Sequence, residues 1–157
     1  MREDSNKYMQ RAIKLAEISV ENGGGPFGAV IIKDGEIVAE GSNCVTLNND
    51  PTAHAEVSVI RKACSILNTF DLSGCEIYTS CEPCPMCLSA IYWAHIDYIY
   101  YGCSKDDAKD IGFDDSFIYE QIALKPENRS IPAKQISHKE ALSAFRMWEQ
   151  KDDKIEY

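Results

Sequence analysis

The chain has 157 residues, of which 45% are hydrophobic and 26% charged, a composition typical of one folded domain and not of a disordered chain. Its 25 acidic and 16 basic residues give a formal charge of −9, which disfavours binding to nucleic acid or to an anionic membrane. The longest uncharged stretch in the middle of the chain, Pro83 to Ile96, is shorter than the roughly 20 residues that cross a bilayer, so no transmembrane helix is expected.

The N-terminal residues and the cysteines indicate the compartment. Six of the first seven residues, Arg2 to Lys7, are polar or charged, and no apolar segment typical of a secretory signal follows them. The seven cysteines are an odd number, and three of them lie within Cys81 to Cys87, which favours metal binding or catalysis over a disulfide framework. We therefore expect a cytoplasmic protein.

The first third of the chain predicts a helix and then two strands. Ser5 is expected to cap the helix, and the residues from Gly23 to Pro26 end it. The apolar stripe of this helix comprises Tyr8, Ala12, Ile13, Leu15, Ala16 and Val20. An apolar run at 29–32, the turn Asp34-Gly35 and a second run at 36–39 are typical of a β-hairpin.

The middle of the chain predicts two more strands, each preceded by a helix. Asp50 and Pro51 are a typical cap and first-turn proline for a helix that runs to about Leu67, and a strand follows at 76–80. After a short turn at 81–83, a mostly buried helix contains Leu88, Ile91 and Tyr92. A strand at 98–101 follows this helix directly.

The last third predicts short helical pieces over 104–129, a strand at 131–136 and a terminal helix at 139–150. One face of the terminal helix is apolar and carries Ala141, Leu142, Phe145 and Trp148. Helices that alternate with strands after an opening hairpin predict a three-layer α/β/α sandwich with a mixed five-stranded sheet, in which the later strands are parallel.

Two short motifs predict a catalytic zinc site. They are His54-Ala55-Glu56 and Pro83-Cys84-Pro85-Met86-Cys87. Zinc favours imidazole and thiolate ligands, and two cysteines three residues apart at a helix start can point at one ion. Three such ligands leave a fourth position for water, whose pKa zinc lowers to roughly 7. Glu56 would then reach this water as a proton carrier, and the combined motif is typical of zinc-dependent nucleobase deaminases.

A structural zinc site is the alternative interpretation. Cys81, Cys84, Cys87 and His54 could form a closed Cys₃His site that leaves no position for water, as in a zinc-stabilised interaction module. Cys81 decides between the two, and its predicted position at the end of a strand favours a packed thiol over a ligand. The remaining cysteines are expected to be small buried hydrophobes, and they are Cys44, Cys64, Cys75 and Cys103.

Segments along nearly the whole chain resemble the cytidine deaminase-like superfamily and, within it, the bacterial guanine deaminases. The zinc motif is shared across the superfamily, whereas Gly112-Phe113-Asp114-Asp115 and the terminal Glu156-Tyr157 narrow the resemblance to the guanine deaminases. The other matching segments are 24–30, 43–45, 49–56 and 78–87.

The resemblance implies one Zn²⁺ per subunit held by His54, Cys84 and Cys87, with Glu56 as the proton shuttle. A zinc-bound hydroxide would attack C2 of guanine and yield xanthine and ammonia. The resemblance also implies substrate-binding residues, namely Phe27, Asn43, the backbone of Ala55, Asp115 and Tyr157, with a catalytic role for Asp115 as well. It further implies a homodimer whose C-terminal segment, about residues 105–157, is exchanged between subunits.

Each of these roles has a structural alternative. Phe27 could belong to the core, Asn43 to a turn and Asp115 to a helix cap, while a terminal residue such as Tyr157 is by default frayed. Within the superfamily, the alternative substrates are adenosine in transfer RNA and free cytosine. The charge of −9 favours a free base, because an enzyme that acts on RNA needs a basic surface for the backbone.

Overall fold

The computed structural model describes residues 5–157, apart from the side chain of Ser5, so the predicted cap at Ser5 lies outside the described part. The chain divides after Asp115 into two compact units, a first unit that ends at Asp115 and a second unit over Ser116–Tyr157. Among the described residues, no helix combines the length and the apolar character needed to cross a membrane.

The first unit is built on a mixed sheet. Its four strands are β1 Gly28–Lys33, β2 Glu36–Ser42, β3 Cys75–Cys81 and β4 Tyr98–Cys103, in the order β2-β1-β3-β4. Strand β1 runs antiparallel to both β2 and β3, whereas β3 and β4 are parallel, as predicted for the later strands.

The predicted fifth strand is wrong. Residues 131–136 form irregular chain, and Ile131 and Ile136 are 83% and 75% exposed. The second unit, all of whose residues are described, contains no strand that could pair with this segment. Pro132 also lacks the N–H that a strand ladder needs. The sheet therefore has four strands in the described part of the chain.

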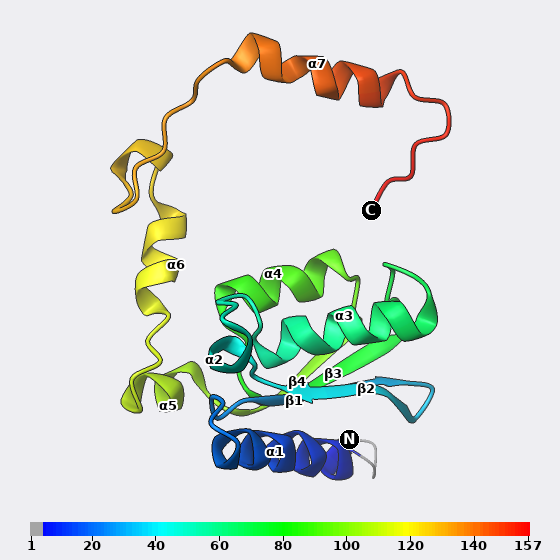
Figure 1. Cartoon of the computed structure of the whole chain (residues 1–157), viewed down its shortest axis with the longest axis vertical. Coiled ribbons are helices and arrows are strands. Elements are labelled where there is room, and N and C mark those ends of the chain that lie inside the picture. Colours follow the sequence, from blue (N-terminus) through cyan, green and yellow to red (C-terminus); the bar gives the residue numbers. More distant parts are fainter. Residues whose placement is uncertain (1–4) are drawn as a thin grey trace. The chain divides into compact units, whose positions relative to one another are not determined.

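Helices cover both faces of the sheet (Figure 1). Helix α1 (Ser5–Glu21) packs on one face, and α3 (Ala55–Leu67) and α4 (Pro85–Trp93) lie on the other. The short helices α2 (Val45–Asn48) and α5 (Lys105–Asp110) lie in the connections. The predicted three-layer α/β/α arrangement is thus present in the first unit.

Side chains of β1 alternate between two cores, one on each face of the sheet. Val30 and Ile32 pack with Tyr8 and Tyr78 beneath α1. The opposite core forms against α3 and α4 and includes Ala29, Ile31, Val59, Ile77 and Ile91. Both faces of β1 are therefore buried, which fixes its position at the centre of the unit.

Helix α1 approaches the start of β1 closely at Gly28. A Cβ atom at this position would lie 2.3 Å from the carbonyl oxygen of Ala12, so only glycine fits without a shift of the backbone. In the predicted apolar stripe of α1, Tyr8, Ala12 and Ala16 are buried, but Ile13 and Val20 are exposed. The buried face of the helix is consequently narrower than the apolar stripe that the sequence predicts.

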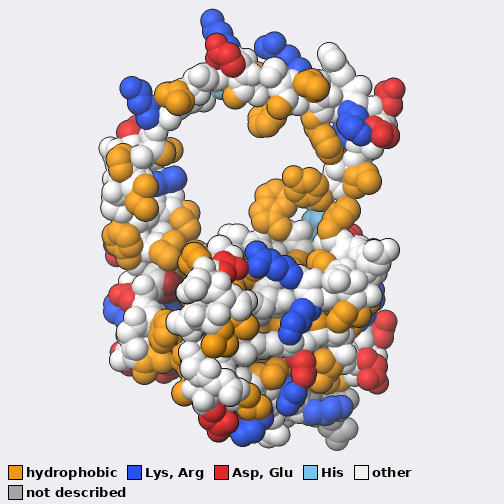
Figure 2. Space-filling model, viewed as in Figure 1, with side chains coloured by type: hydrophobic (Ala, Val, Ile, Leu, Met, Phe, Trp, Pro, Cys, Tyr) orange, Lys and Arg blue, Asp and Glu red, His pale blue; other side chains and the backbone are white. Residues whose placement is uncertain are grey.

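The second unit consists of α6 (Ser116–Ala123), the 3₁₀ helix η1 (Pro126–Asn128) and α7 (His138–Glu149). The predicted terminal helix is confirmed to within a residue at each end. None of the 42 residues of this unit is buried, and most of its large apolar side chains are exposed (Figure 2). The predicted apolar face of α7 includes Phe145, which is 74% exposed.

Candidate metal centre and active site

The N-termini of α3 and α4 carry the predicted metal ligands. His54 is the N-cap residue of α3, and Cys84 is the N-cap residue of α4, which begins with Pro85. The prediction that α3 begins at Asp50-Pro51 is wrong, because the Asp50 carboxylate instead accepts hydrogen bonds from the backbone N–H and the hydroxyl of Thr52. This turn precedes His54 and places it at the true helix start.

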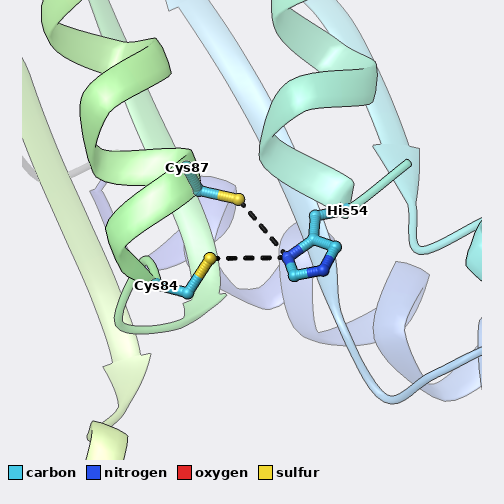
Figure 3. Close-up of side chains that lie close together, drawn as sticks. All are labelled: His54, Cys84 and Cys87. Carbon is cyan, nitrogen blue, oxygen red and sulfur yellow. Dashed lines mark hydrogen bonds between the residues drawn. The ribbon is translucent and has the colours of Figure 1, made fainter. Parts of the chain in front are cut away.

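The three predicted ligands converge (Figure 3). The Nδ1 atom of His54 lies 3.6 Å from Sγ of Cys84 and 3.5 Å from Sγ of Cys87, and the donor atoms all lie within 4.8 Å of one another. Ordinary Zn–N and Zn–S bonds in a tetrahedron separate nitrogen from sulfur by about 3.6 Å. The spacing and chemistry of this donor set therefore fit a zinc ion.

Cys81 does not belong to this group in the described part of the chain. Its Sγ atom contacts the carbonyl oxygen of Ser104 at 3.7 Å, and burial raises its pKa to about 12. Its thiol therefore packs at the end of β3, apart from the three donor atoms that converge. The arrangement favours three ligands with a fourth position for water over a closed Cys₃His site.

The pKa values of the two ligand thiols are shifted in opposite directions. A hydrogen bond from Cys87, helped by the nearby His54, lowers the pKa of Cys84 to about 4. The same contact with Cys84, together with burial, raises the pKa of Cys87. The hydrogen bond to Cys84 also raises the pKa of His54. The arrangement thus favours the thiolate form of Cys84, which lies at the N-terminus of α4.

Glu56 lies beside the ligands but is not one of them in the described part of the chain. It belongs to the first turn of α3, is only 5% exposed, and its Oε1 atom lies 3.1 Å from the Thr79 hydroxyl oxygen. Burial raises the pKa of Glu56 above its ordinary value. A buried carboxyl group with a raised pKa can both take up and release a proton, as a proton carrier must.

Comparison with known proteins identifies the family. A family model described as the cytidine and deoxycytidylate deaminase zinc-binding region matches residues 2–103. The chain belongs to this deaminase family. The match spans the sheet of the first unit and includes His54, Glu56, Cys84 and Cys87.

This deaminase is similar along nearly its whole length to guanine deaminase of Bacillus subtilis. The sequences are 54% identical over 96% of this chain and 97% of that protein, and the solved structure superimposes with a TM-score of 0.95 over 98% of each chain. The solved guanine deaminase of Nitrosomonas europaea is 31% identical, with a TM-score of 0.68 over 79% of this chain and 68% of that one.

Similarity to the transfer RNA enzymes is shorter. A tRNA-specific adenosine deaminase of Aquifex aeolicus is 42% identical over 60% of this chain and 62% of that protein. The similarity to guanine deaminase therefore extends well beyond the segment that this chain shares with the adenosine deaminase.

Phe27, Asn43 and Ala55 all belong to the first unit. Phe27 packs against the core and makes an edge-to-face contact with Phe113, with ring centres 5.0 Å apart. The buried Asn43 accepts a hydrogen bond from the N–H of Val45 on its side-chain oxygen and donates its own N–H to the carbonyl of Phe27. Ala55 is fully buried as the first residue of α3. Phe27 thus packs as a core residue would, and Asn43 makes the hydrogen bonds of a turn residue. Their roles in substrate binding stay predictions.

Asp115 and Tyr157 belong to different units. Asp115 is partly buried at the end of the first unit, where desolvation and then the charge of Cys84 raise its pKa. It is therefore near the predicted ligands. Tyr157 ends the second unit and is 73% exposed. The predicted roles of both residues in substrate binding also stay predictions.

The sequence did not point to two buried hydroxyl residues of β3, Thr79 and Ser80. Thr79 contacts Glu56, and the Ser80 hydroxyl accepts a hydrogen bond from the N–H of Gly28 at 3.0 Å, which ties β3 to the residue after Phe27. The signal in the sequence was weak. Both residues lie in a strand whose other positions follow an ordinary buried pattern.

Proposed function

We propose that this deaminase hydrolyses guanine to xanthine and ammonia. The observation that carries the proposal is the similarity to Bacillus subtilis guanine deaminase over 96% of the chain, which includes the second unit, whereas the adenosine deaminase similarity covers 60%. The charge of −9 agrees with a free base as substrate, because RNA would require a basic surface.

His54, Cys84 and Cys87 would hold the zinc ion. When bound there, zinc supplies a Lewis acid that lowers the pKa of a coordinated water to about 7. Glu56 would take one proton from the attacking water and give it to a ring nitrogen of guanine. It would then take the second proton from the new C2 hydroxyl group and give it to the departing amine, so that the C2–N bond breaks as the carbonyl forms. Water adds at C2 and ammonia leaves, so one guanine and one water give one xanthine and one ammonia.

The remaining predicted residues would bind the base. The amide of Asn43 and the N–H of Ala55, at the N-terminus of α3, would hydrogen-bond the purine, and the ring of Phe27 would contact its face. Asp115 would contact the exocyclic amine or carry a proton. The ring or carboxylate of Tyr157 would help to close the pocket.

Release of ammonia tests this function directly. Zinc-loaded protein is incubated separately with guanine, cytosine, adenine and their nucleosides, and ammonia is measured. We expect release from guanine and little from the other compounds. Release from cytosine alone, or from adenosine in transfer RNA alone, would assign the alternative substrates, and no release from any of them would favour a structural zinc module.

We further propose a homodimer in which the second unit is exchanged between subunits. A unit of 42 residues without a single buried residue cannot stabilise itself, because folding requires apolar surface to leave water. Exposed apolar side chains of this unit, such as Phe145 and Trp148, are suited to packing on a second copy. Tyr157 would then serve the active site of the partner subunit, whereas Asp115 belongs to the first unit and would serve the site of its own chain.

The mass in solution and the terminal residue test the dimer. Light scattering after gel filtration should give twice the mass of 17.6 kDa. Removal of Tyr157 should lower turnover without release of zinc. A monomer that deaminates guanine at the full rate, or unchanged turnover after the truncation, would contradict the exchanged arrangement.

We also propose a cytoplasmic location. All seven cysteines are free thiols in the structure, as expected in a reducing compartment. Fractionation of cells followed by immunodetection would check it.

A further inference from the structure

Thr79 lies at a fully buried position of the core, where an apolar residue is usual. It lies in β3 between Ala29 of β1 and Tyr101 of β4, and it is fully buried. Strand alternation places it on the same face as Ile77, which packs in the core beneath α3. A buried hydroxyl group is destabilising unless it is hydrogen-bonded, so its partners identify its role.

The Thr79 hydroxyl bridges the proton carrier and the backbone before the metal ligands. Its Oγ1 atom lies 3.1 Å from Oε1 of Glu56 and 3.0 Å from the carbonyl oxygen of Cys81. Cys81 ends β3 three residues before Cys84. One hydroxyl group therefore links the carboxyl group on α3 to the strand end that leads to α4.

A hydroxyl group is well suited to this bridge. It has one hydrogen to donate and lone pairs that accept, whereas a carbonyl oxygen only accepts. Thr79 can donate to the Glu56 carboxylate, or donate to Cys81 and accept from a Glu56 carboxyl that holds a proton. The contact with Glu56 is therefore available with and without the proton that Glu56 transfers.

We propose that Thr79 is a positioning residue that holds the Glu56 carboxyl group in its reactive orientation during deamination. The inference rests on the proposed role of Glu56 in proton transfer. Thr79 acts through Glu56 and not through the substrate. Its loss should consequently slow the chemical step and leave binding of guanine and zinc intact.

A pair of substitutions separates the hydroxyl from the volume of the side chain. Thr79→Val removes the hydroxyl at nearly constant volume, and Thr79→Ser keeps the hydroxyl and removes a methyl group. Thr79→Val should lower kcat by about 10- to 100-fold, because a misplaced proton carrier loses part of its catalytic contribution. KM for guanine should stay within about threefold and zinc content at the level of the parent, and Thr79→Ser should restore kcat to within about threefold.

Ile77→Val is the matched control, because it trims a buried apolar side chain on the same face of β3 and leaves the hydrogen bond between Thr79 and Glu56 in place. It should keep the kcat of the parent. If Thr79→Val does not fold, Thr79→Cys removes the hydroxyl with a similar small side chain and replaces it in the comparison.

Three results would overturn the inference. These are a kcat of Thr79→Val within about twofold of the parent, a loss confined to KM, and a failure of Thr79→Ser to restore kcat. Glu56→Gln is measured in parallel. An active Glu56→Gln enzyme contradicts the proposed function itself, whereas an inactive Glu56→Gln with a fully active Thr79→Val contradicts only the role of Thr79.

Discussion

The two units of the chain differ in how much of their regular structure is supported by a buried core. In the first unit, five of the six residues of β1 are buried, and helices on both faces complete two cores. In the second unit, α6 and α7 have regular helical structure but bury nothing. Helices of 8 and 12 residues are marginal in water without tertiary packing. Regular secondary structure is therefore evidence of a folded unit only where a core accompanies it.

The difference also separates two kinds of functional residue. The ligand atoms of His54, Cys84 and Cys87 are held by helix starts that the first unit fixes through its own core. Tyr157 belongs to the unit without a core, so its position depends on whatever covers that unit. We expect metal binding to be a property of the first unit and turnover to need both.

Substitution of a metal ligand should have the largest effect. Cys87→Ser removes a soft thiolate from the zinc site, so we expect loss of zinc and of guanine deamination. Metal analysis and ammonia release measure the two effects. Cys103→Ser is the control and should behave as the parent. The prediction that Cys103 is buried is wrong, since it is an exposed free thiol. Full zinc content in Cys87→Ser would remove Cys87 from the ligand set.

Separation of the two units should have the next largest effect. A chain that ends at Asp115 should keep its fold and its zinc but lose at least about 100-fold in turnover, because proximity of catalytic and binding groups is lost. The isolated peptide 116–157 should show little helix by circular dichroism. A stably helical peptide, or an active truncated chain, would contradict the contrast between the units.

A core substitution should measure the stability that the first unit supplies. Ile77 is fully buried, so Ile77→Ala should lower the free energy of unfolding by about 2–5 kcal/mol. Ile66→Ala, at a position that is 63% exposed, should change it by less than about 0.5 kcal/mol. Urea unfolding of the two variants gives both values, and equal losses would refute the assignment of the core.

The smallest effect concerns an ion pair between α1 and β2. Arg11 lowers the pKa of Glu40 below its ordinary value of 4.5, mainly through a hydrogen bond. The charged form is favoured in the folded state, so the stabilisation exists at neutral pH and is lost as the pH falls from about 4.5 downward. Both side chains are more than one-third exposed, which limits the effect of Glu40→Gln at pH 7 to about 1 kcal/mol.

Urea unfolding of the parent and of Glu40→Gln at pH 7 and at pH 3 measures this dependence. The two proteins should differ less at the lower pH. A difference that grows on acidification would reverse the sign of the linkage.

The sequence predicted the parts that depend on local pattern. The metal motif is specific enough to bring His54, Cys84 and Cys87 together, and the turn Asp34-Gly35 has positive φ at both residues, as a tight hairpin requires. The four strands of the first unit were also predicted, with ends that differ by at most three residues.

The errors concern contacts that a local pattern does not contain. The segment 131–136 has strand-forming isoleucines, but a strand needs a neighbouring edge to pair with. The role of Thr79 depends on strand register, which places its hydroxyl beside Glu56 from a position 23 residues away. Tyr92 was predicted to lie in a mostly buried helix, but it is 74% exposed. The helix α4 is short and apolar, so the elements that pack against it determine which of its faces is buried.

Ammonia release from guanine by the Glu56→Gln enzyme is the most direct test of the central claim. The variant keeps the shape of the side chain but cannot carry the proton. We predict that it binds zinc as the parent does and loses at least about 100-fold in kcat, within the range that general acid–base catalysis contributes. A zinc-loaded Glu56→Gln enzyme that deaminates guanine at the rate of the parent would contradict the account.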